Sequence, residues 1–313
     1  MTSRVELGTV PGLGALLLQG AARSARLAVA ARRGWQPGTL PDVDYVARGI
    51  RADPVQLTAY QHLLGESASD VLPAGFVHVL AFPVATALMV RADFPLPLAG
   101  LVHLANRVDQ RCATTLDDTL EVRAYARGLR AHRSGAQVDL VTEVHVGGAN
   151  AAGGRGGTLA WRGVSTYLAR GLHLPPPNPP PPHASDGARA RACTTSDASV
   201  PTGQWRLAGD VGRRYGAVSG DRNPIHLSAL TARALGFRRA IAHGMYTASR
   251  ALAGVGAART DTFTWTVEFA KPVLLPGTVL VRIVHDDVAG GFAYRGWNPG
   301  SGQVHFAGTV IPH

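Results

Sequence analysis

Short alternating segments dominate two separate stretches of the chain, and each stretch begins with a longer apolar segment. Alternation of apolar and polar residues with a period of two, ended by turn residues such as Gly290-Gly291, is typical of antiparallel β-strands. The predicted strands lie at 101–105, 119–125, 138–146 and 159–168 in the first stretch, and at 266–270, 279–286, 292–297 and 304–311 in the second. Ahead of each set, an Ala-rich apolar segment predicts a helix, at 81–90 and at 242–253.

A helix followed by several antiparallel strands therefore occurs twice. This predicts an α+β fold with two antiparallel sheets, each wrapped around a long helix. The tract Pro175–Pro182 lies between the two stretches. Proline cannot continue a helix or donate a hydrogen bond to a sheet, so residues 175–203 are predicted to form an extended linker. The predicted units are accordingly residues 37–174 and 204–313.

Residues 1–36 precede the first predicted unit and have a helical pattern of their own. Leucines at 13, 16, 17 and 27 recur at helical spacing, with arginines between and after them. We expect a basic surface helix packed on the first unit; the alternatives are a weak contact with an anionic membrane surface, or disorder. A secretory signal is not expected, because most of the basic residues follow the apolar run.

Composition restricts the classes of protein to which the chain can belong. A chain of 313 residues with 46% hydrophobic and 17% charged residues can bury a large core. It contains no uncharged apolar run of the roughly 18 residues that span a membrane. Two cysteines, Cys112 and Cys193, lie far apart without metal-ligand neighbours, which fits a reducing cytoplasm and not a disulfide framework.

The formal net charge of +10 raises the question of a nucleic-acid partner. Lys271 is the only lysine, the arginines are scattered along the chain, and aromatic residues make up only 6% of it. Because basic and aromatic residues do not interleave, no nucleic-acid partner is predicted. A basic surface equally suits an acidic carrier protein or a cofactor that bears phosphate groups.

The segment from Tyr215 to Met245 concentrates the residues that can carry chemistry. Asp221 stands five residues before His226, across a turn that contains proline. A neighbouring carboxylate can hold the tautomer of a histidine and tune its pKa, so the pair suits proton transfer near neutral pH. By itself, the stretch after Asp221 is also consistent with an Asx-turn that begins a helix.

The two halves can be compared directly, since they share one scaffold. Placing Tyr60 on Tyr215 puts Glu66 opposite Asp221, and placing the apolar helices together puts Phe82-Pro83 opposite His243-Gly244. The first half thus keeps the scaffold and lacks the polar set. Residues needed merely to fold the unit would occur in both halves, so their restriction to the second half indicates chemistry.

The motifs SGDRNPIH at Ser219–His226 and GFRRAIAHGM at Gly236–Met245 resemble the MaoC-like (R)-specific enoyl-thioester hydratase/dehydratase family. The two-unit layout is similar to its double-hotdog members, among them the actinobacterial 3-hydroxyacyl-thioester dehydratases, over roughly residues 37–313. The resemblance implies that Asp221 and His226 are the catalytic acid–base pair. It also implies that the substrates are (R)-3-hydroxyacyl and trans-2-enoyl thioesters of coenzyme A or acyl carrier protein, in fatty-acid metabolism.

Several further residues have expected roles. Gly244 opens the second Ala-rich helix, where its N–H can stabilise negative charge on the thioester oxygen. Ser219 and Asn223 orient the catalytic pair or cap the turn, and His243 shapes the site or contacts the substrate. Ser249 matches a family position near the site, although a helix serine facing a neighbouring backbone is equally consistent.

No metal or redox cofactor is predicted, because the chain has no His/Cys cluster and no glycine-rich loop after a strand. The first unit would hold the acyl chain, with five apolar residues as tunnel lining or ordinary core: Leu80, Phe82, Val84, Leu88 and Met89. Two other functions stay open, namely a hotdog thioesterase and a catalytically silent acyl-binding subunit. A monomer that completes a hotdog pair internally and a homodimer are both consistent with the sequence.

Overall fold

The computed structural model describes residues 2–32, 37–147, 157–174 and 200–313. The first part of the chain contains β1 (Ser3–Leu7), α1 (Leu13–Arg32), β2 (Val43–Ile50), α2 (Pro54–Leu64), α3 (Ala74–Met89), β3 (Leu101–Gln110), β4 (Leu120–His132), β5 (Gly135–Val146) and β6 (Thr158–Arg170). The second part contains β7 (Gly203–Leu207), α4 (Val211–Ser219), α5 (Pro224–Leu227), α6 (Ala229–Ala234), α7 (Gly244–Val255), the 3-10 helix η1 (Gly256–Arg259), β8 (Phe263–Phe269), β9 (Gly277–Asp286), β10 (Gly291–Trp297) and β11 (Val304–Pro312).

Every strand expected from the alternating pattern is present, with ends that differ by a few residues. The predicted helix at 242–253 corresponds to α7, whereas the one at 81–90 is only the second half of the longer α3. The expected linker lies outside the described residues from 175 to 199.

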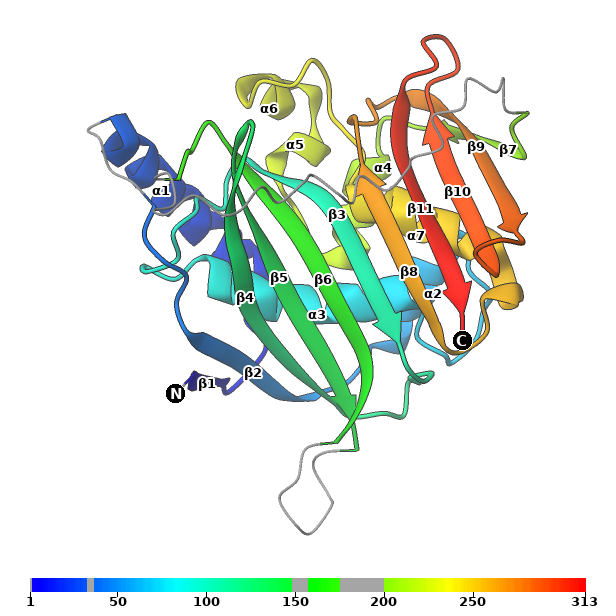
Figure 1. Ribbon diagram of the computed structural model, residues 1–313, viewed down its shortest axis with the longest axis horizontal. Helices are drawn as coiled ribbons and strands as arrows, with labels where there is room; N and C mark the ends of the chain where they lie inside the picture. Colours follow the sequence, from blue (N-terminus) through cyan, green and yellow to red (C-terminus); the bar gives the residue numbers. More distant parts are fainter. Residues whose placement is uncertain (1, 33–36, 148–156, 175–199) are drawn as a thin grey trace.

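The strands form one continuous sheet, and the expectation of two separate sheets is wrong. Its order is β1-β2-β4-β5-β6-β3-β8-β11-β10-β9-β7, in 11 strands. β3 and β8 join the two halves by antiparallel pairing from Ala105 opposite Glu268 to Gln110 opposite Phe263 (Figure 1). Each would otherwise be an edge strand with unpaired N–H and C=O groups, so their pairing satisfies both edges.

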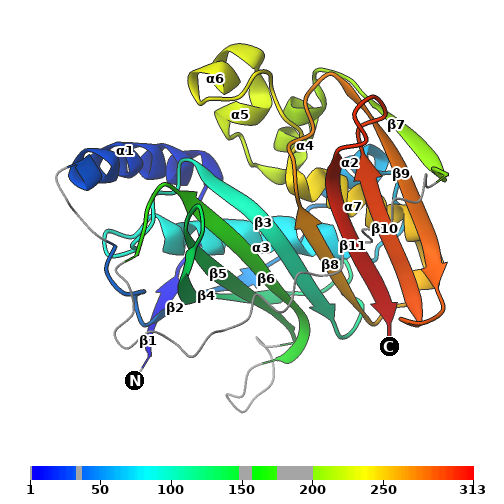
Figure 2. The ribbon, with the colours of Figure 1, turned by 45° about the horizontal axis from the view of Figure 1, so that its top comes forward.

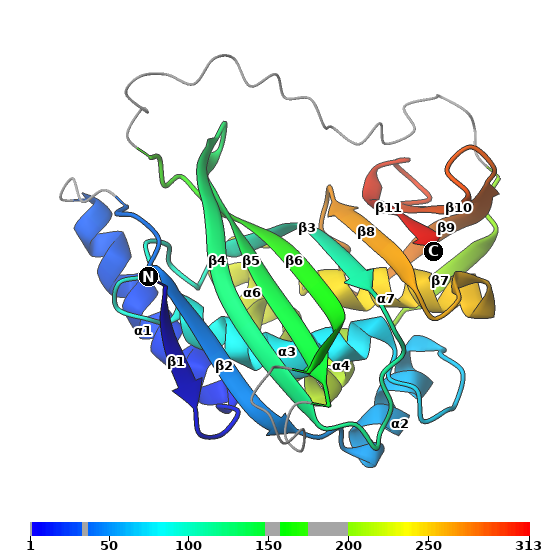
Figure 3. The ribbon, with the colours of Figure 1, turned by 60° about the horizontal axis from the view of Figure 1, so that its bottom comes forward.

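The two central helices, α3 and α7, lie against the same face of this sheet (Figure 3). α3 is apolar on almost every side because it is enclosed: 13 of its 16 residues are buried. α7 is shorter and is the central helix of the second unit. Each unit is therefore a helix covered by one half of the curved sheet, which is antiparallel apart from the parallel pair of β1 and β2.

The structure changes the correspondence between the two halves. α2 and α4 both end at a left-handed glycine, Gly65 and Gly220, which supports placing Tyr60 on Tyr215. Isolated bridges precede both central helices at equivalent places, at Val71 and at Ile241. The start of α7 thus matches the start of α3, and the predicted match with Phe82-Pro83 is wrong.

The Ala-rich pattern misled this comparison, since it covers only the later turns of α3. The corrected correspondence also shows why the first unit lacks the polar set. A short connection joins α2 to α3, whereas α5 and α6 are inserted between α4 and α7. Figure 2 shows this inserted segment above the strands, close to the junction of the two units.

The N-terminal helix α1 packs on the first unit. Leu13 and Leu16 are buried, and the guanidinium of Arg23 donates hydrogen bonds to the main-chain carbonyls of Leu96 and Phe94. Within the described ranges, no helix combines the length and the apolar character that crossing a bilayer requires.

Candidate active site

Local hydrogen bonds fix the turn that carries Asp221. The hydroxyl of Ser219 accepts the main-chain N–H of Asp221 at 3.2 Å, and the Asp221 carboxylate accepts the N–H of Asn223 at 3.1 Å through Oδ1. The Asn223 side chain in turn caps α5 by accepting the N–H of Ile225 at 3.4 Å. The Asx-turn is therefore real, and it leaves Oδ2 of Asp221 available for chemistry.

His226 lies on α5 with one ring nitrogen engaged. Its Nδ1 is 2.8 Å from the main-chain carbonyl oxygen of Ile241. A carbonyl can only accept, so Nδ1 carries the proton and Nε2 holds a free lone pair. The side chain is buried, with only 8% of the residue exposed. The fold thus fixes both the tautomer and the direction of a possible base.

His243 ties the catalytic turn to the start of α7. Its ring stacks on that of His226, with centroids 3.6 Å apart and planes 24° apart. Its Nε2 donates to the main-chain carbonyl of Asp221 at 2.9 Å and lies 3.7 Å from Oδ2 of the same residue. Two roles were open for His243, shaping the site and contacting the substrate. These contacts are those expected for the first role.

Both histidines are neutral at physiological pH. Burial, and to a lesser extent the nearby His243, lower the pKa of His226 to about 3. Burial also lowers the pKa of His243 to about 4. Burial, together with the charge of Asp221, raises the pKa of Tyr215 and of Tyr167 above the ordinary range. The site therefore offers an ionisable carboxylate beside neutral imidazoles.

The carboxylate and the two imidazoles are close enough to share one small ligand. One ligand atom from each of Asp221, His226 and His243 lies within 4.8 Å of the others. Such a set raises the question of a metal ion, but one nitrogen of each ring is already hydrogen-bonded to a main-chain carbonyl, that of Ile241 for His226 and that of Asp221 for His243. A water molecule hydrogen-bonded to both the carboxylate and His226 fits this spacing, because two such bonds span roughly 5.6 Å.

Gly244 is the first residue of α7, where no carbonyl of the same helix can reach its N–H. A Cβ atom at this position would lie 3.0 Å from the ring of Phe269, so the glycine permits a close contact. Ser249 lies further along the same helix. Its buried hydroxyl lies between α3 and α7, beside Gly75 and the hydroxyl of Tyr60.

The first unit contributes residues that the sequence analysis missed. His103 on β3 stacks on Tyr167 of β6, with centroids 4.6 Å apart, and its ring also lies 5.1 Å from that of Phe269. A stack of rings thus leads from Gly244 into the first unit. The sequence contained one sign that the first unit holds polar site residues: His78 is the only ionisable residue in the apolar helix α3.

The chain is similar to several known proteins. The family model "MaoC like domain" matches residues 200–296. The 3-hydroxyacyl-thioester dehydratase X of Mycobacterium tuberculosis is 33% identical over 277 residues, covering 87% of this chain and 90% of that protein. The crystal structure of HtdX from the same organism has a TM-score of 0.71 at 32% identity, covering 86% of this chain and 100% of that chain.

A second solved structure supports the fold alone. It is a conserved Mycobacterium tuberculosis protein described as having a double hotdog fold, with a TM-score of 0.50 at 14% identity, covering 88% of this chain and 96% of that chain. The predicted double hotdog is therefore confirmed at the level of the fold.

Proposed function

The chain belongs to the MaoC-like dehydratase family, and on this premise we propose that Asp221, His226 and the N–H of Gly244 form its active site. The protein is a hydro-lyase that interconverts 3-hydroxyacyl thioesters and 2-enoyl thioesters. The (R)-hydroxy and trans-enoyl configurations are part of the proposal. The observation that carries it is the fixed tautomer of His226, which leaves Nε2 unprotonated on a ring that has a nitrogen within 4.8 Å of the Asp221 carboxylate.

In the hydration direction, a water molecule between the two side chains attacks C3 of the enoyl group. His226 Nε2 accepts one proton of this water while its oxygen bonds to C3. The π electrons move through C2 to the thioester carbonyl, which becomes an enolate. Asp221 orients the water, then takes the proton from His226 and delivers it to C2, so that hydroxyl and proton add across the double bond and both side chains return to their starting states. Dehydration follows the same steps in reverse.

The enolate oxygen needs a fixed partner. The first N–H groups of α7 lie at the positive end of the helix dipole, and the glycine at 244 leaves room for a substrate to approach. Loss of one such donor slows acyl chemistry by about 10²–10³ in other enzymes. Ser219 and Asn223 support the pair by fixing the Asp221 turn, and His243 by holding its carbonyl.

Hydration of crotonyl-CoA tests the reaction class. Loss of the enoyl absorbance without release of free thiol supports the hydro-lyase. Release of free thiol would instead favour the thioesterase alternative, and the absence of both with intact binding would favour the silent subunit. In reverse, (R)-3-hydroxybutyryl-CoA should gain the enoyl absorbance and the (S) form should not.

Substitutions test the assigned roles. We expect Asp221→Asn and His226→Gln each to lower kcat by roughly 10²–10⁴ while the protein stays folded. The chain offers a matched control, because His285 and Asp287 form an exposed pair at 2.8 Å in the same unit. His285→Gln and Asp287→Asn should keep wild-type rates. Near-normal rates in both site variants would refute the assignment.

The acyl carrier belongs to the proposal as well. Exposed arginines on and beside the inserted segment make no ion pair with the described residues: Arg213, Arg222, Arg233 and Arg238. Their charge suits the phosphates of coenzyme A or an acidic carrier protein. Initial rates on both carriers across a salt series distinguish these two substrates.

We further infer a monomer in the cytoplasm, divided into the units 37–174 and 204–313. The internal pairing of β3 with β8 supports the monomer, since it already joins two hotdog units. A homodimer in light scattering would contradict this inference.

A further inference from the structure

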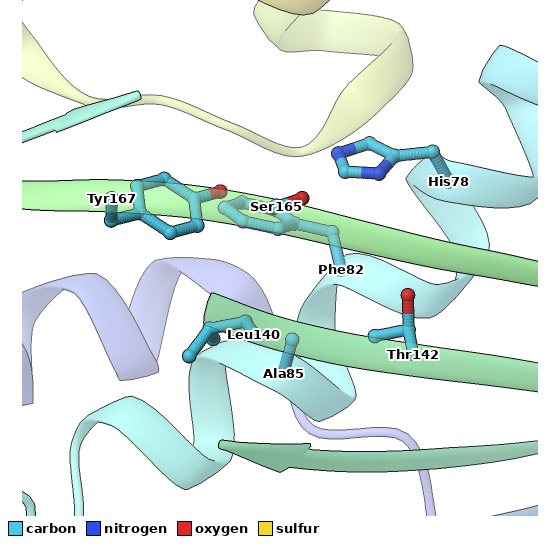
Figure 4. Close-up of a pocket in the computed structure, with 7 residues that line it drawn as sticks. All are labelled: His78, Phe82, Ala85, Leu140, Thr142, Ser165 and Tyr167. Atoms are coloured by element: carbon cyan, nitrogen blue, oxygen red, sulfur yellow. The ribbon is translucent and has the colours of Figure 1, made fainter. Parts of the chain in front are cut away.

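A small pocket lies in the first unit between α3 and the strands β5 and β6 (Figure 4). Its volume is about 10 Å³, close to the space that one water molecule needs. Of the five residues expected to line an acyl tunnel, Phe82 lines this pocket, whereas Val84, Leu88 and Met89 are fully buried in the core. The other apolar walls are Ala85 and Leu140.

Four polar side chains complete the wall: His78, Thr142, Ser165 and Tyr167. All four are at least nine-tenths buried, with exposed fractions of 8% for His78, 9% for Tyr167 and 7% each for Thr142 and Ser165. A pocket made only for a hydrocarbon chain has no use for this lining, because hydroxyl and imidazole groups lose their water when an alkyl group displaces it.

These polar groups have unused hydrogen-bonding capacity. The hydroxyl of Ser165 donates to the side-chain oxygen of Asn106 at 2.8 Å, which leaves its own lone pairs free to accept. Within the described ranges, the side chains of His78 and Thr142 make no hydrogen bond, whereas the hydroxyl of Tyr167 lies beside that of Ser165. Burial lowers the pKa of His78 to about 4, so the neutral ring offers one donor and one acceptor.

A series of ring contacts leads from the candidate active site to the pocket. Tyr167 stacks on His103, His103 contacts Phe269, and Phe269 faces Gly244, where the thioester oxygen is proposed to bind. The charge of Asp221 also raises the pKa of Tyr167 in addition to burial. An acyl chain that leaves the reacting carbons along this stack therefore approaches the polar wall.

We propose that this pocket selects acyl chains that carry one oxygen function, a hydroxyl or keto group, over plain alkyl chains of the same size. The inference rests on the proposed function, since it names the substrate class of that same site. The oxygen would take the place of the single water that the pocket can hold. It would bond to Thr142, Tyr167 or His78.

Matched pairs of thioesters test the inference. Each pair consists of an ω-hydroxy trans-2-enoyl-CoA and the plain enoyl-CoA one carbon longer, because a hydroxyl replaces a methyl group of similar size. Across a series of chain lengths, the ratio of kcat/KM within a pair should peak at one length, at roughly tenfold in favour of the hydroxylated chain. Saturated ω-hydroxyacyl-CoA and acyl-CoA pairs cannot react, so they report binding alone. The Kd of the plain chain divided by the Kd of the hydroxylated chain should peak at the same length.

Isosteric variants test whether the preference for hydroxylated chains arises in this pocket. Thr142→Val should lower kcat/KM for the hydroxylated partner and raise it for the plain partner, whereas damage to the fold would lower both. Thr278→Val on β9, in the other unit, is the matched control and should change neither. If neither the ratio of kcat/KM nor the ratio of Kd favours the hydroxylated chain at any length, the inference is overturned. The pocket would then hold only water.

The two proposals fail in different ways. Hydration of plain thioesters without a peak in the ratio sinks only the oxygen preference. If no thioester is hydrated, the proposed function fails, and the Kd ratios of the saturated pairs still decide whether the pocket binds an oxygen function.

Discussion

Lowering the pH gives a sharp test of His226 as a base that is already neutral in the free enzyme. An ordinary histidine has a pKa near 6.5, whereas burial and the neighbouring His243 lower that of His226 to about 3. The pH profile of kcat/KM reports the groups of the free enzyme. We therefore expect the acid limb of this profile to lie far below the position typical of histidine catalysis.

The size of the difference follows from the two pKa values. A base with a pKa of 6.5 is roughly nine-tenths protonated at pH 5.5, so kcat/KM would fall about tenfold between pH 7.5 and 5.5. With a pKa of about 3, less than roughly 1% of His226 is protonated at pH 5.5. The predicted change in kcat/KM over this interval is then within experimental error.

The assay is initial-rate hydration of crotonyl-CoA from pH 5 to pH 8 at constant ionic strength. Circular dichroism at each pH, and recovery of the rate after return to pH 7.5, separate titration from unfolding. A reversible tenfold loss with a midpoint between pH 6 and 7, while the protein stays folded, would refute the neutral buried base.

Three further outcomes follow from described contacts. Gly244→Ala places a methyl group 3.0 Å from the ring of Phe269 and should lower kcat/KM about ten- to a hundredfold, while Gly254→Ala in the same helix meets only the end of a flexible side chain and should not. Glu66→Gln leaves its ion-pair partner Arg259 without a carboxylate and should lower the free energy of unfolding in urea by about 3 kcal/mol, without a comparable loss of kcat/KM. Burial lowers the pKa of five histidines, so the unfolded chain binds more protons than the folded one below pH 6.5. Tm should therefore fall as the pH falls from 6.5 to 4.5, and a flat Tm over that interval would contradict this reasoning.

Local patterns predicted the elements well because each pattern reports burial directly. In β4, for example, Leu120, Val122 and Ala124 are buried, and the residues between them face outward, as period-two alternation requires. The pairing of β3 with β8 was not predictable in this way. Alternation says which face of a strand is buried, but it does not say which strand lies beside it.

The site was likewise predictable where it depends on local sequence and not where it depends on distant contacts. The spacing of Asp221 and His226 indicated proton transfer, yet the carbonyl of Ile241 that fixes the tautomer comes from a distant loop. For Ser249 the motif gave a position on the helix, but its neighbours Gly75 and Tyr60 come from the other unit and could not be read from the motif. Tyr167 was missed since its importance depends on β6 lying beside β3.

The β3–β8 junction also bears on how such a chain can evolve. In an assembly of two identical chains, every substitution appears on both sides of the symmetry axis, so a change that widens one acyl pocket also alters the catalytic copy. Here the axis lies within a single chain, and the halves inherit their mutations independently. One half carries Asp221 and His226, while in the other half the acid at the position of Asp221, Glu66, forms an ion pair with Arg259 from the first of these halves. Active-site titration should accordingly count one site per 32.8 kDa chain.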